Sequence, residues 1–535
     1  MQYLIKALRR HTPQSEPLIG QVPNSALGHA WAVNDWTRLS RFLVLGSEGG
    51  SFYAGERTLT RENAQAVERC VLSDGPRAVA EIVAVSRDGR APKNDPAIFA
   101  LAMAAGIGDE RTRRVALEAL PVVCRTGTHL FRFATFVEGF RGWGRSLRRA
   151  VGSWYVDREV DALAYQAVKY RRRTARNPVL DVTDEHARLF DWIAHEGDTA
   201  GLPRIVEGFE RAQRAGSAAA TAELVRDYGL PREAIRPEHL GDAEVWRALL
   251  EDMPMTAMIR NLATMTRVGV VAPGSTGTAR VVEQLADTER LRAARVHPIA
   301  VLAALRTYAH GGGIRGNATW APVAQVVDAL DAAFYAAFAS VEPTGNRMLL
   351  ALDVSGSMTW GDVAGVPGLT PRDASAAMAL VTAATEPKHE IVGFHAGKGG
   401  ETFARAHNWL GGIRGLTPLT ISPRQRLDDA IRTVSDLPFG GTDCALPMLY
   451  ASRRELEVDT FVIYTDSETW AGDVHPAEAL RAYRRRSGID ARLVVVGMVS
   501  NGFSIADPND PGMLDVVGFD AATPALIAGF ANGSF

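Results

Sequence analysis

Hydrophobic and polar residues follow two different periods along this chain. Over residues 60–340, apolar positions recur at the three- and four-residue spacing of helices that bury one face. In the segment "NDPAIFALAMAAGIGDERTRRVALEAL", Asp95 can cap a helix and Pro96 suits its first position. Gly106 and Gly108 then stop that helix, and a second amphipathic helix begins at once. The pattern predicts helical hairpins.

Paired helices of this kind recur through the first two thirds of the chain. They can be drawn through "GTHLFRFATFVEGF" with "WGRSLRRAVGSWY", through "DAEVWRALL" with "MTAMIRNLATMT", and through "HPIAVLAALRTY" with "VAQVVDALDAAFYAAFA". Repeated hairpins with little strand signal indicate an α-solenoid of the HEAT or armadillo kind, although no exact sequence period is visible. We therefore predict an all-α helical-repeat domain over residues 1–342.

After "SVEPTGNR" the pattern changes to strands that alternate with helices. Short apolar runs predict strands at residues 348–352, 390–394, 460–464 and 492–496. Helical stretches such as "DASAAMALVTAAT" and "HPAEALRAYRRR" lie between them. Apolar strands that alternate with helices predict an α/β domain over residues 343–535, with a doubly wound parallel sheet covered on both faces. Ligands bind such sheets beyond the carboxyl ends of the strands.

A cluster of oxygen-bearing side chains falls at that end of the predicted sheet. Asp353, Ser355 and Ser357 follow the first strand in "LLALDVSGSMTW". Thr442 in "FGGTDCALPM" and Asp466 in "VIYTDSET" occupy comparable loop positions. Carboxylates and hydroxyls without imidazole or thiolate suit Mg²⁺ or Mn²⁺, with waters completing the octahedron. The alternative is that D-x-S-x-S only caps a helix and satisfies local amides.

This arrangement resembles the metal-ion-dependent adhesion site of von Willebrand factor A domains, which are doubly wound sheets. The resemblance implies that the five residues bind a divalent cation, most simply Mg²⁺, directly or through water. One coordination place would stay open for an acidic group of a partner.

Composition narrows the class of protein. The chain has 535 residues and a formal net charge of -2, so it is too long for one compact core and gives no global sign of a nucleic-acid partner. Its N-terminus lacks a signal-peptide pattern and no segment approaches the roughly 20 apolar residues of a spanning helix, so we expect a cytoplasmic protein without a membrane partner. Cys70, Cys124 and Cys444 are isolated, which argues against disulfides or a thiolate zinc site.

One stretch departs from this neutral balance. Residues 125–176 contain twelve Lys and Arg against four acids. The basic residues are interspersed with Trp143, Trp154, Tyr155 and Tyr170, a mixture that suits contact with phosphates and stacking on unpaired bases. The alternative is that the arginines coat a solvated helix face.

Several longer segments resemble one family. "GGTDCALPMLYA", "YTDSETWAGDVHPAEALRAYRRR" and "GMVSNGFSIADPNDPGMLDVVGFD" are similar to the C-terminal half of the Ro autoantigen family. "RLSRFLVLGSEGGSFY", "MPMTAMIRNLATMT" and "HPIAVLAALRTY" are similar to its N-terminal TROVE module. Members of that family are RNA-binding proteins that join a ring of HEAT repeats to a von Willebrand factor A domain. The chain is identified as a bacterial member.

The resemblance implies what the basic stretch binds. In the family, small noncoding Y RNAs bind the outer basic surface of the ring, and its central hole takes single-stranded 3′ ends of misfolded RNAs. A Y RNA could also tether an exoribonuclease such as polynucleotide phosphorylase. The candidate RNA contacts here are Arg132, Arg145, Arg148, Arg149, Lys169, Arg171, Arg172, Arg173 and, from its approximate position alone, His186. After "KYRRR" the chain reads "TARNPVLDVTDEHARLF", which is less basic than the animal members.

Three functions remain open at this point. The first is a noncatalytic RNA-binding protein that acts in RNA quality control, RNA maturation or stress recovery. The second is a protein-interaction scaffold that captures a partner's carboxylate through the metal site. The third, a metal-dependent phosphoesterase, is disfavoured because no general base or second metal cluster accompanies the two carboxylates.

Overall fold

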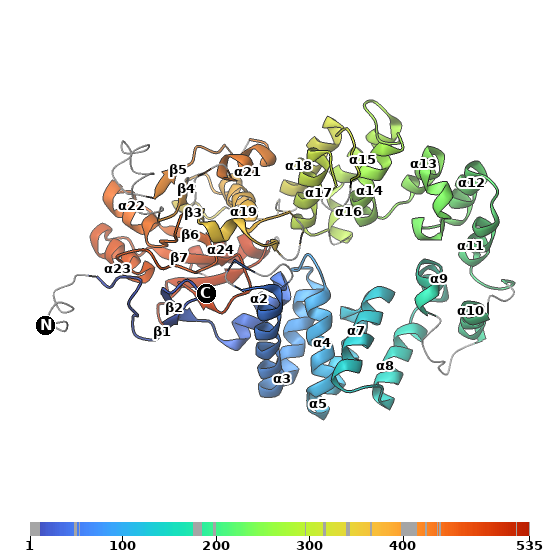
Figure 1. Cartoon of the computed structure of the whole chain (residues 1–535), viewed down its shortest axis with the longest axis horizontal. Coiled ribbons are helices and arrows are strands. Elements are labelled where there is room, and N and C mark those ends of the chain that lie inside the picture. The colour runs from blue at the N-terminus through green and yellow to red at the C-terminus, as the bar shows by residue number, and fades with distance from the viewer. Residues whose placement is uncertain are drawn as a thin grey trace.

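A computed structural model describes most of the chain. The described residues are 11–47, 51–52, 54–174, 184–195, 199–294, 296–313, 317–336, 338, 343–363, 366, 368–396, 415–422, 425–435, 437, 440–519 and 522–533. No described helix is long and apolar enough to cross a membrane. A helical part and an α/β part are both present, which confirms the predicted architecture (Figure 1).

The helices of the first part form a curved array, and both of its ends lie beside the α/β part (Figure 1). They are α2 (Asp35–Leu45), α3 (Glu56–Arg87), α4 (Asp95–Ile107), α5 (Glu110–Glu118), α6 (Leu120–Val123), α7 (Gly127–Phe140), α8 (Arg145–Val156), α9 (Val160–Thr174), α10 (Asp184–His195), α11 (Arg204–Arg214), α12 (Ala218–Tyr228), α13 (Ala243–Glu251), α14 (Met255–Arg267), α15 (Thr276–Ala286), α16 (Thr288–Ala293), α17 (Pro298–His310) and α18 (Ala324–Ala336). Short 3₁₀ turns, η1 (Arg232–Ala234) and η2 (Pro237–Gly241), connect α12 to α13.

The start and the end of α4 differ in detail from the sequence prediction. Asn94, not Asp95, is the N-cap residue, and its amide nitrogen donates to the Val123 carbonyl at 2.7 Å. Gly106 does not stop the helix but lies inside it, and Gly108 is the C-cap residue. A Cβ at position 106 would lie 2.5 Å from the Phe140 Cβ. This glycine therefore allows α4 and α7 to pack closely.

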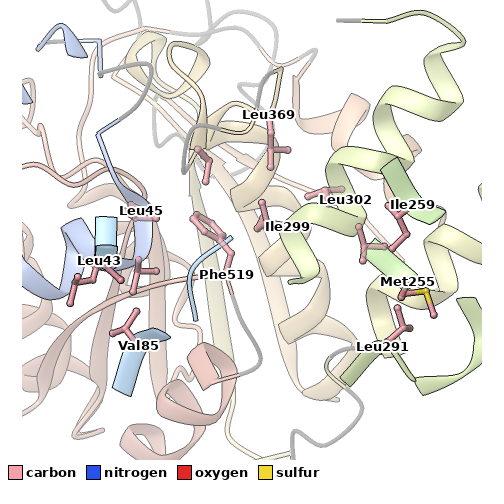
Figure 2. Packing of buried hydrophobic residues seen from close by; sticks show 14 of the residues in the cluster. Leu43, Leu45, Val85, Met255, Ile259, Leu291, Ile299, Leu302, Leu369 and Phe519 are labelled. Carbon is pink, nitrogen blue, oxygen red and sulfur yellow. The ribbon is translucent and has the colours of Figure 1, made fainter. Parts of the chain in front are cut away.

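The two ends of the array contact each other beside the α/β part. The ring nitrogen Nε2 of His297, which precedes α17, donates to the carbonyl of Arg90, which follows α3, at 3.1 Å. Figure 2 shows Leu45 and Val85 of this N-terminal end together with Ile299 of α17 and Phe519 of the α/β part. These side chains belong to one continuous buried cluster, so the two parts share a core.

The α/β part is built on a six-stranded sheet of order β5-β4-β3-β6-β7-β9. Its strands are β3 (Met348–Asp353), β4 (His389–Phe394), β5 (Leu416–Pro418), β6 (Thr460–Thr465), β7 (Arg492–Gly497) and β9 (Met513–Val517). The four strands predicted from the sequence are present and parallel. The sheet is nevertheless mixed, not purely parallel as predicted, because the short edge strand β5 pairs antiparallel with β4.

Helices cover both faces of this sheet, as predicted. They are α19 (Pro371–Thr385), α21 (Leu427–Ser435), α22 (Leu446–Arg454), α23 (Pro476–Ser487) and α24 (Ala522–Ala531), and the short 3₁₀ turn η3 (Gly356–Thr359) follows β3. Alternate residues of one strand enter different cores, because successive side chains of a strand point to opposite faces. Leu350 packs on the side of α19 and α21, whereas Leu349 packs on the side of α22 and α23.

A second, three-stranded sheet joins the N-terminal segment to the α/β part. It contains β1 (Gln21–Pro23), β2 (His29–Ala32) and β8 (Phe503–Ser504) in antiparallel pairs. Trp31 of β2 pairs with Ser504, so the start of the chain adds strands to its last third. The sequence pattern does not predict this pairing.

Candidate functional site

Three loops converge at the carboxyl ends of the central strands. Asp353 ends β3 and Asp466 follows β6, and these two strands are neighbours in the sheet. The amide of Gly356 donates to the carbonyl of Gly440 at 3.2 Å, which brings the loop of Thr442 to the loop after β3. The carbonyl of Thr442 in turn accepts from the amide of Trp470 at 3.1 Å, in the loop after β6.

The oxygen-bearing side chains of this cluster are buried, and hydrogen bonds join several of them. The hydroxyl oxygens of Ser355 and Ser357 lie 3.1 Å apart. The hydroxyl of Thr465 donates to Asp353 Oδ2 at 2.6 Å. Asp353 and Ser355 are fully buried, and Asp466 is 4% exposed. A site of this kind is preorganised, because its groups are held by packing and by their neighbours.

Capping explains only one of these contacts. Asp353 Oδ1 accepts from the amide of Ser355 at 2.9 Å, which is the local amide contact of the capping interpretation. Ser355 itself stands at the N-cap position of η3, yet its side chain makes no capping hydrogen bond. Its hydroxyl faces Ser357 instead, so the capping interpretation does not account for the hydroxyls.

Burial destabilises the charged form of both aspartates. Loss of solvent raises the pKa of Asp353, although hydrogen bonds from Ser355 and Thr465 oppose the rise. Burial raises the pKa of Asp466 to about 8, and the carboxylates of Asp353 and Glu468 add to the rise. A cation between Asp353 and Asp466 would stabilise the charged form of both groups.

The donor set fits a hard divalent cation. Two carboxylates and the hydroxyls of Ser355, Ser357 and Thr442 are the oxygen ligands that Mg²⁺ and Mn²⁺ prefer. Among the described residues, no group of three or more His, Cys, Asp and Glu side chains is arranged to hold a metal ion, so a thiolate or imidazole centre has no candidate there. The buried, mutually repelling carboxylates are the observation that favours a cation.

The structure adds residues around this cluster that the sequence analysis missed. Thr465 orients Asp353, and Asn501 donates from Nδ2 to the carbonyl of Asp466 at 2.7 Å. The same Nδ2 lies 3.3 Å from Glu468 Oε1, and the amide of Glu468 donates to Asp466 Oδ1 at 3.1 Å. Thr465 and Glu468 flank Asp466 in sequence and could have been proposed. Asn501 comes from another loop and gave no signal.

The predicted basic surface is clearest on α8. Arg145, Arg148 and Arg149 are exposed, and α8 contains no acidic residue. Within the part of the chain that the structure describes, no carboxylate pairs with them. Their charges are therefore available to an anionic ligand such as a phosphate backbone.

Two other predicted cations are engaged by the protein itself. Arg132 of α7 is half exposed and forms an ion pair with Asp95. Lys169 of α9 lies 4.0 Å from Glu233 Oε1 and is mostly covered. Both can contact RNA only in competition with these acids.

Two of the aromatic residues of the basic stretch are buried and are not part of a stacking surface. Trp154 is fully buried, and its indole nitrogen donates to the Cys124 carbonyl at 2.5 Å. Tyr155 is 3% exposed, and Trp143 is partly buried against the same core. The prediction of stacking on Trp154 and Tyr155 is therefore wrong. The side chain of Tyr170 lies outside the described residues.

The remaining candidate RNA contacts are either buried or have side chains outside the described residues. His186 is 7% exposed, and its Nε2 lies 3.2 Å from the Arg158 carbonyl, so its ring packs inside the array. Arg171, Arg172 and Arg173 belong to α9, but their side chains are outside the described residues. The less basic segment that follows them lies mostly outside the described residues as well.

Comparisons with known proteins agree over the whole chain. The model of the Ro60 vWA domain matches residues 347–531, and the model of the TROVE domain matches residues 22–180 and 230–307. The chain is 44% identical to the RNA-binding protein RO60 of Deinococcus radiodurans over 549 residues, which covers 100% of both chains. It is 33% identical to the RNA-binding protein RO60 of Caenorhabditis elegans, covering 96% of this chain and 90% of the other.

A solved structure is similar as well. The crystal structure of the Deinococcus radiodurans RO (RSR) protein matches with a TM-score of 0.68 and 43% identity. The match covers 94% of this chain and 100% of that chain.

Proposed function

This chain belongs to the Ro60 family, and from that premise we propose that it is an RNA-binding protein without catalytic activity. The observation that carries the proposal is the full-length similarity to two proteins named as RNA-binding. The helical array would bind RNA, in keeping with the TROVE model that matches it.

The finer proposal concerns the kind of RNA. We propose that a small structured Y RNA binds the outer basic surface of the array and that single-stranded 3′ ends of misfolded RNAs bind in the ring. Such a protein would act in the cytoplasm in RNA quality control, RNA maturation or stress recovery. An exoribonuclease such as polynucleotide phosphorylase would be a partner through the Y RNA.

The arginines of α8 give this proposal its most direct physical support. Arg145, Arg148 and Arg149 share one exposed surface, and the described residues leave their charges unpaired. A protein that neutralises phosphates with such residues releases counterions, so its affinity for RNA falls as salt rises. Three lost contacts to a duplex stretch of the structured RNA would reduce the slope of log affinity against log salt by about three.

Crosslinking and sequencing of RNA copurified with the full-length protein from its own cells tests this proposal. The variant Arg145→Glu/Arg148→Glu/Arg149→Glu is compared with Arg485→Glu/Arg486→Glu, which reverses two exposed charges on α23. We expect one small structured RNA on the wild type and on the α23 variant, and its loss from the α8 variant. Salt titrations with the RNA recovered from the wild type should give a smaller slope of log affinity against log salt for the α8 variant than for the wild type.

Two results would contradict the proposal. Background RNA alone on the wild type would remove the Y RNA assignment. Equal RNA recovery from the wild type and the α8 variant would move the contact away from α8.

We further propose that the oxygen cluster binds Mg²⁺, with Asp353, Ser355, Ser357, Thr442 and Asp466 as its ligands directly or through water. When bound, the ion would supply a positive centre with an open place for an acidic group. Mn²⁺ would fit the same donors.

Thermal unfolding with and without the ion tests the metal site. At an Mg²⁺ concentration of about 100 times Kd, binding stabilises the folded state by about 2.7 kcal/mol, which is a rise in Tm of about 5–10 °C for a domain of this size. We expect Asp353→Asn to abolish the rise. Asp490→Asn removes a fully exposed carboxylate of the same domain and should leave the rise intact. An equal rise in all three proteins would mean that Mg²⁺ acts elsewhere.

A second function uses the metal site alone. A partner's carboxylate at the open coordination place would make the α/β part a metal-dependent protein-interaction module. The buried hydroxyl and carboxylate cluster favours this possibility, and it is compatible with RNA binding on the array. Protein capture that requires Mg²⁺, persists after ribonuclease treatment and is lost in Asp353→Asn would support it.

A further inference from the structure

The N-terminal segment of the chain crosses the loops that carry the candidate metal ligands. We define residues 12–32 as the strap; it contains β1 and β2. The strap is attached to the α/β part at both ends. Near its start, Thr12 bonds to Glu478 of α23 through its backbone amide at 2.8 Å, and at its end β2 pairs with β8.

Gln14 of the strap connects two of the metal-site loops. Its Nε2 donates to Asp443 Oδ1 at 2.7 Å, next to Thr442. Its Oε1 accepts from the hydroxyl of Thr469 at 2.5 Å, in the loop of Asp466. Gln14 is fully buried, so both contacts form away from competing water. Gln14 thus adds a buried side-chain connection to the direct backbone bond from Trp470 to Thr442 that already joins the two loops.

A second contact holds the carboxylate beside Asp466. The backbone amides of Ser25 and Ala26 donate to Glu468 Oε2 at 2.8 and 3.3 Å. Glu468 is 1% exposed, and its own amide donates to Asp466 Oδ1. The strap therefore holds the Glu468 side chain, while the Glu468 backbone orients the candidate ligand.

Close packing leaves the strap only one position. A Cβ on Gly28 would lie well inside van der Waals contact of the Thr469 carbonyl and of the Trp470 backbone. A Cβ on Gly472 would meet Gln14 Nε2 and Asp443 Oδ1 in the same way. Both glycines permit an approach that no other residue would allow.

From these contacts we propose that the strap is a positioning element of the metal site, with Gln14 as its principal positioning residue. The inference rests on the proposed divalent-cation site. Mg²⁺ demands near-ideal octahedral geometry, and a loop that shifts by a fraction of an ångström no longer provides it. Loss of a hydrogen bond made directly to a metal ligand typically weakens metal affinity by about 10- to 100-fold, and we expect the same range for a contact that holds the loops of two ligands. The N-terminal segment would thus set the affinity of a site more than 300 residues away in sequence.

Titration of Mn²⁺ into the full-length protein, with free Mn²⁺ followed by electron paramagnetic resonance, tests the proposal. Gln14→Ala should bind Mn²⁺ about 10- to 100-fold more weakly than the wild type. Thr12 lies on the same strap but, among the described residues, its hydrogen bonds go to Glu478 of α23, so Thr12→Ala should bind Mn²⁺ as the wild type does. Far-UV circular dichroism and RNA binding should be unchanged in both, which separates a local effect from unfolding.

A second variant tests the position of the strap without changing Gln14. Gly28→Ala pushes the strap away from Thr469 without removing a hydrogen-bonding side chain, and it should also weaken Mn²⁺ binding at least tenfold. Wild-type affinity in both Gln14→Ala and Gly28→Ala would overturn the role of the strap while the metal site stands. Failure of the wild type to bind Mn²⁺, or equal binding by Asp466→Ala, would overturn the metal site and the inference with it.

Discussion

The largely buried ion pair between Arg41 and Asp515 should contribute far more to stability than an exposed arginine–aspartate pair. Arg41 of α2 donates from Nη2 to both oxygens of Asp515 in β9, at 2.6 and 2.7 Å. Its Nη1 donates to the Phe503 carbonyl at 2.8 Å and to Asn501 at 3.1 Å. The Arg41 side chain is 1% exposed. This residue therefore joins the helical array to two segments of the α/β part.

Arg69 provides the matched control. It donates to both oxygens of Asp35 at 2.7 and 2.8 Å, and this contact lowers the pKa of Asp35. The Arg69 and Asp35 side chains, however, are 54% and 38% exposed. Exposed ion pairs contribute about 0–1 kcal/mol, because water and salt screen them. Both arginines bond to both oxygens of one aspartate, Arg41 through Nη2 alone and Arg69 through Nε and Nη2, and the two pairs differ strongly in burial.

Removal of Arg41 leaves Asp515, whose side chain is 14% exposed, as a mostly covered charge with only the hydroxyl of Ser504 as a remaining partner among the described residues. Breaking a buried pair in this way destabilises a protein by about 3–5 kcal/mol. At about 2–4 °C per kcal/mol, Arg41→Met should lower the Tm of the α/β part by about 6–20 °C. Arg69→Met, which breaks a pair between α3 and α2, should lower the Tm of the protein by less than about 4 °C.

Differential scanning calorimetry of the full-length variants measures both shifts. The double variant Arg41→Met/Asp515→Leu should recover part of the loss, because it leaves no buried charge without a partner. Equal shifts for Arg41→Met and Arg69→Met would refute the reasoning that burial decides the strength of the pair.

Two further predictions concern single side chains. Burial lowers the pKa of His129 to about 4, and the charge of Arg125 adds to this. The unfolded chain binds a proton near pH 6.5 and the folded chain does not, so stability falls as pH drops from 6.5 towards 4, by about 2 kcal/mol at pH 5. Burial lowers the pKa of His395 to about 4 as well, so denaturant titrations at pH 8 and pH 5 should show a loss in both proteins that is smaller by about 2 kcal/mol in His129→Gln than in the wild type. Gly208→Ala should destabilise the array by about 1–3 kcal/mol in the same assay, because the new Cβ overlaps Tyr228, whereas Gly139→Ala meets no atom within 4 Å and should not.

Local patterns allowed much of the fold to be predicted. The four central strands are six-residue, largely apolar segments separated by helical stretches, and this alternation can be recognised from the sequence alone. The edge strand β5 has three residues, which is too short to show a period, so its antiparallel pairing could not be foreseen. The metal ligands could be proposed because Asp353, Ser355 and Ser357 fall within five consecutive positions.

The aromatic residues of α8 show how a local pattern was misread. Leu147, Val151 and Trp154 are spaced by four and three residues, which places all three on the buried face of the helix. Arg145 and Arg148 lie on the exposed face. Composition suggested that arginine and tryptophan act together, but the helical period separates them. The period carried the correct information, and composition did not.

Contacts that span hundreds of residues explain the rest of the difference between prediction and structure. Asn501 donates to the Asp466 carbonyl with its amide nitrogen and accepts from Arg41 with its amide oxygen. Asn501 lies 35 residues from Asp466 but 460 residues from Arg41, and no local pattern in the sequence predicts either contact. Because one amide side chain serves both the domain junction and the metal-site loop, the array and the candidate metal centre form a single hydrogen-bonded unit. The chemistry of such a site can be proposed from its ligands, but its rigidity follows only from the assembled fold.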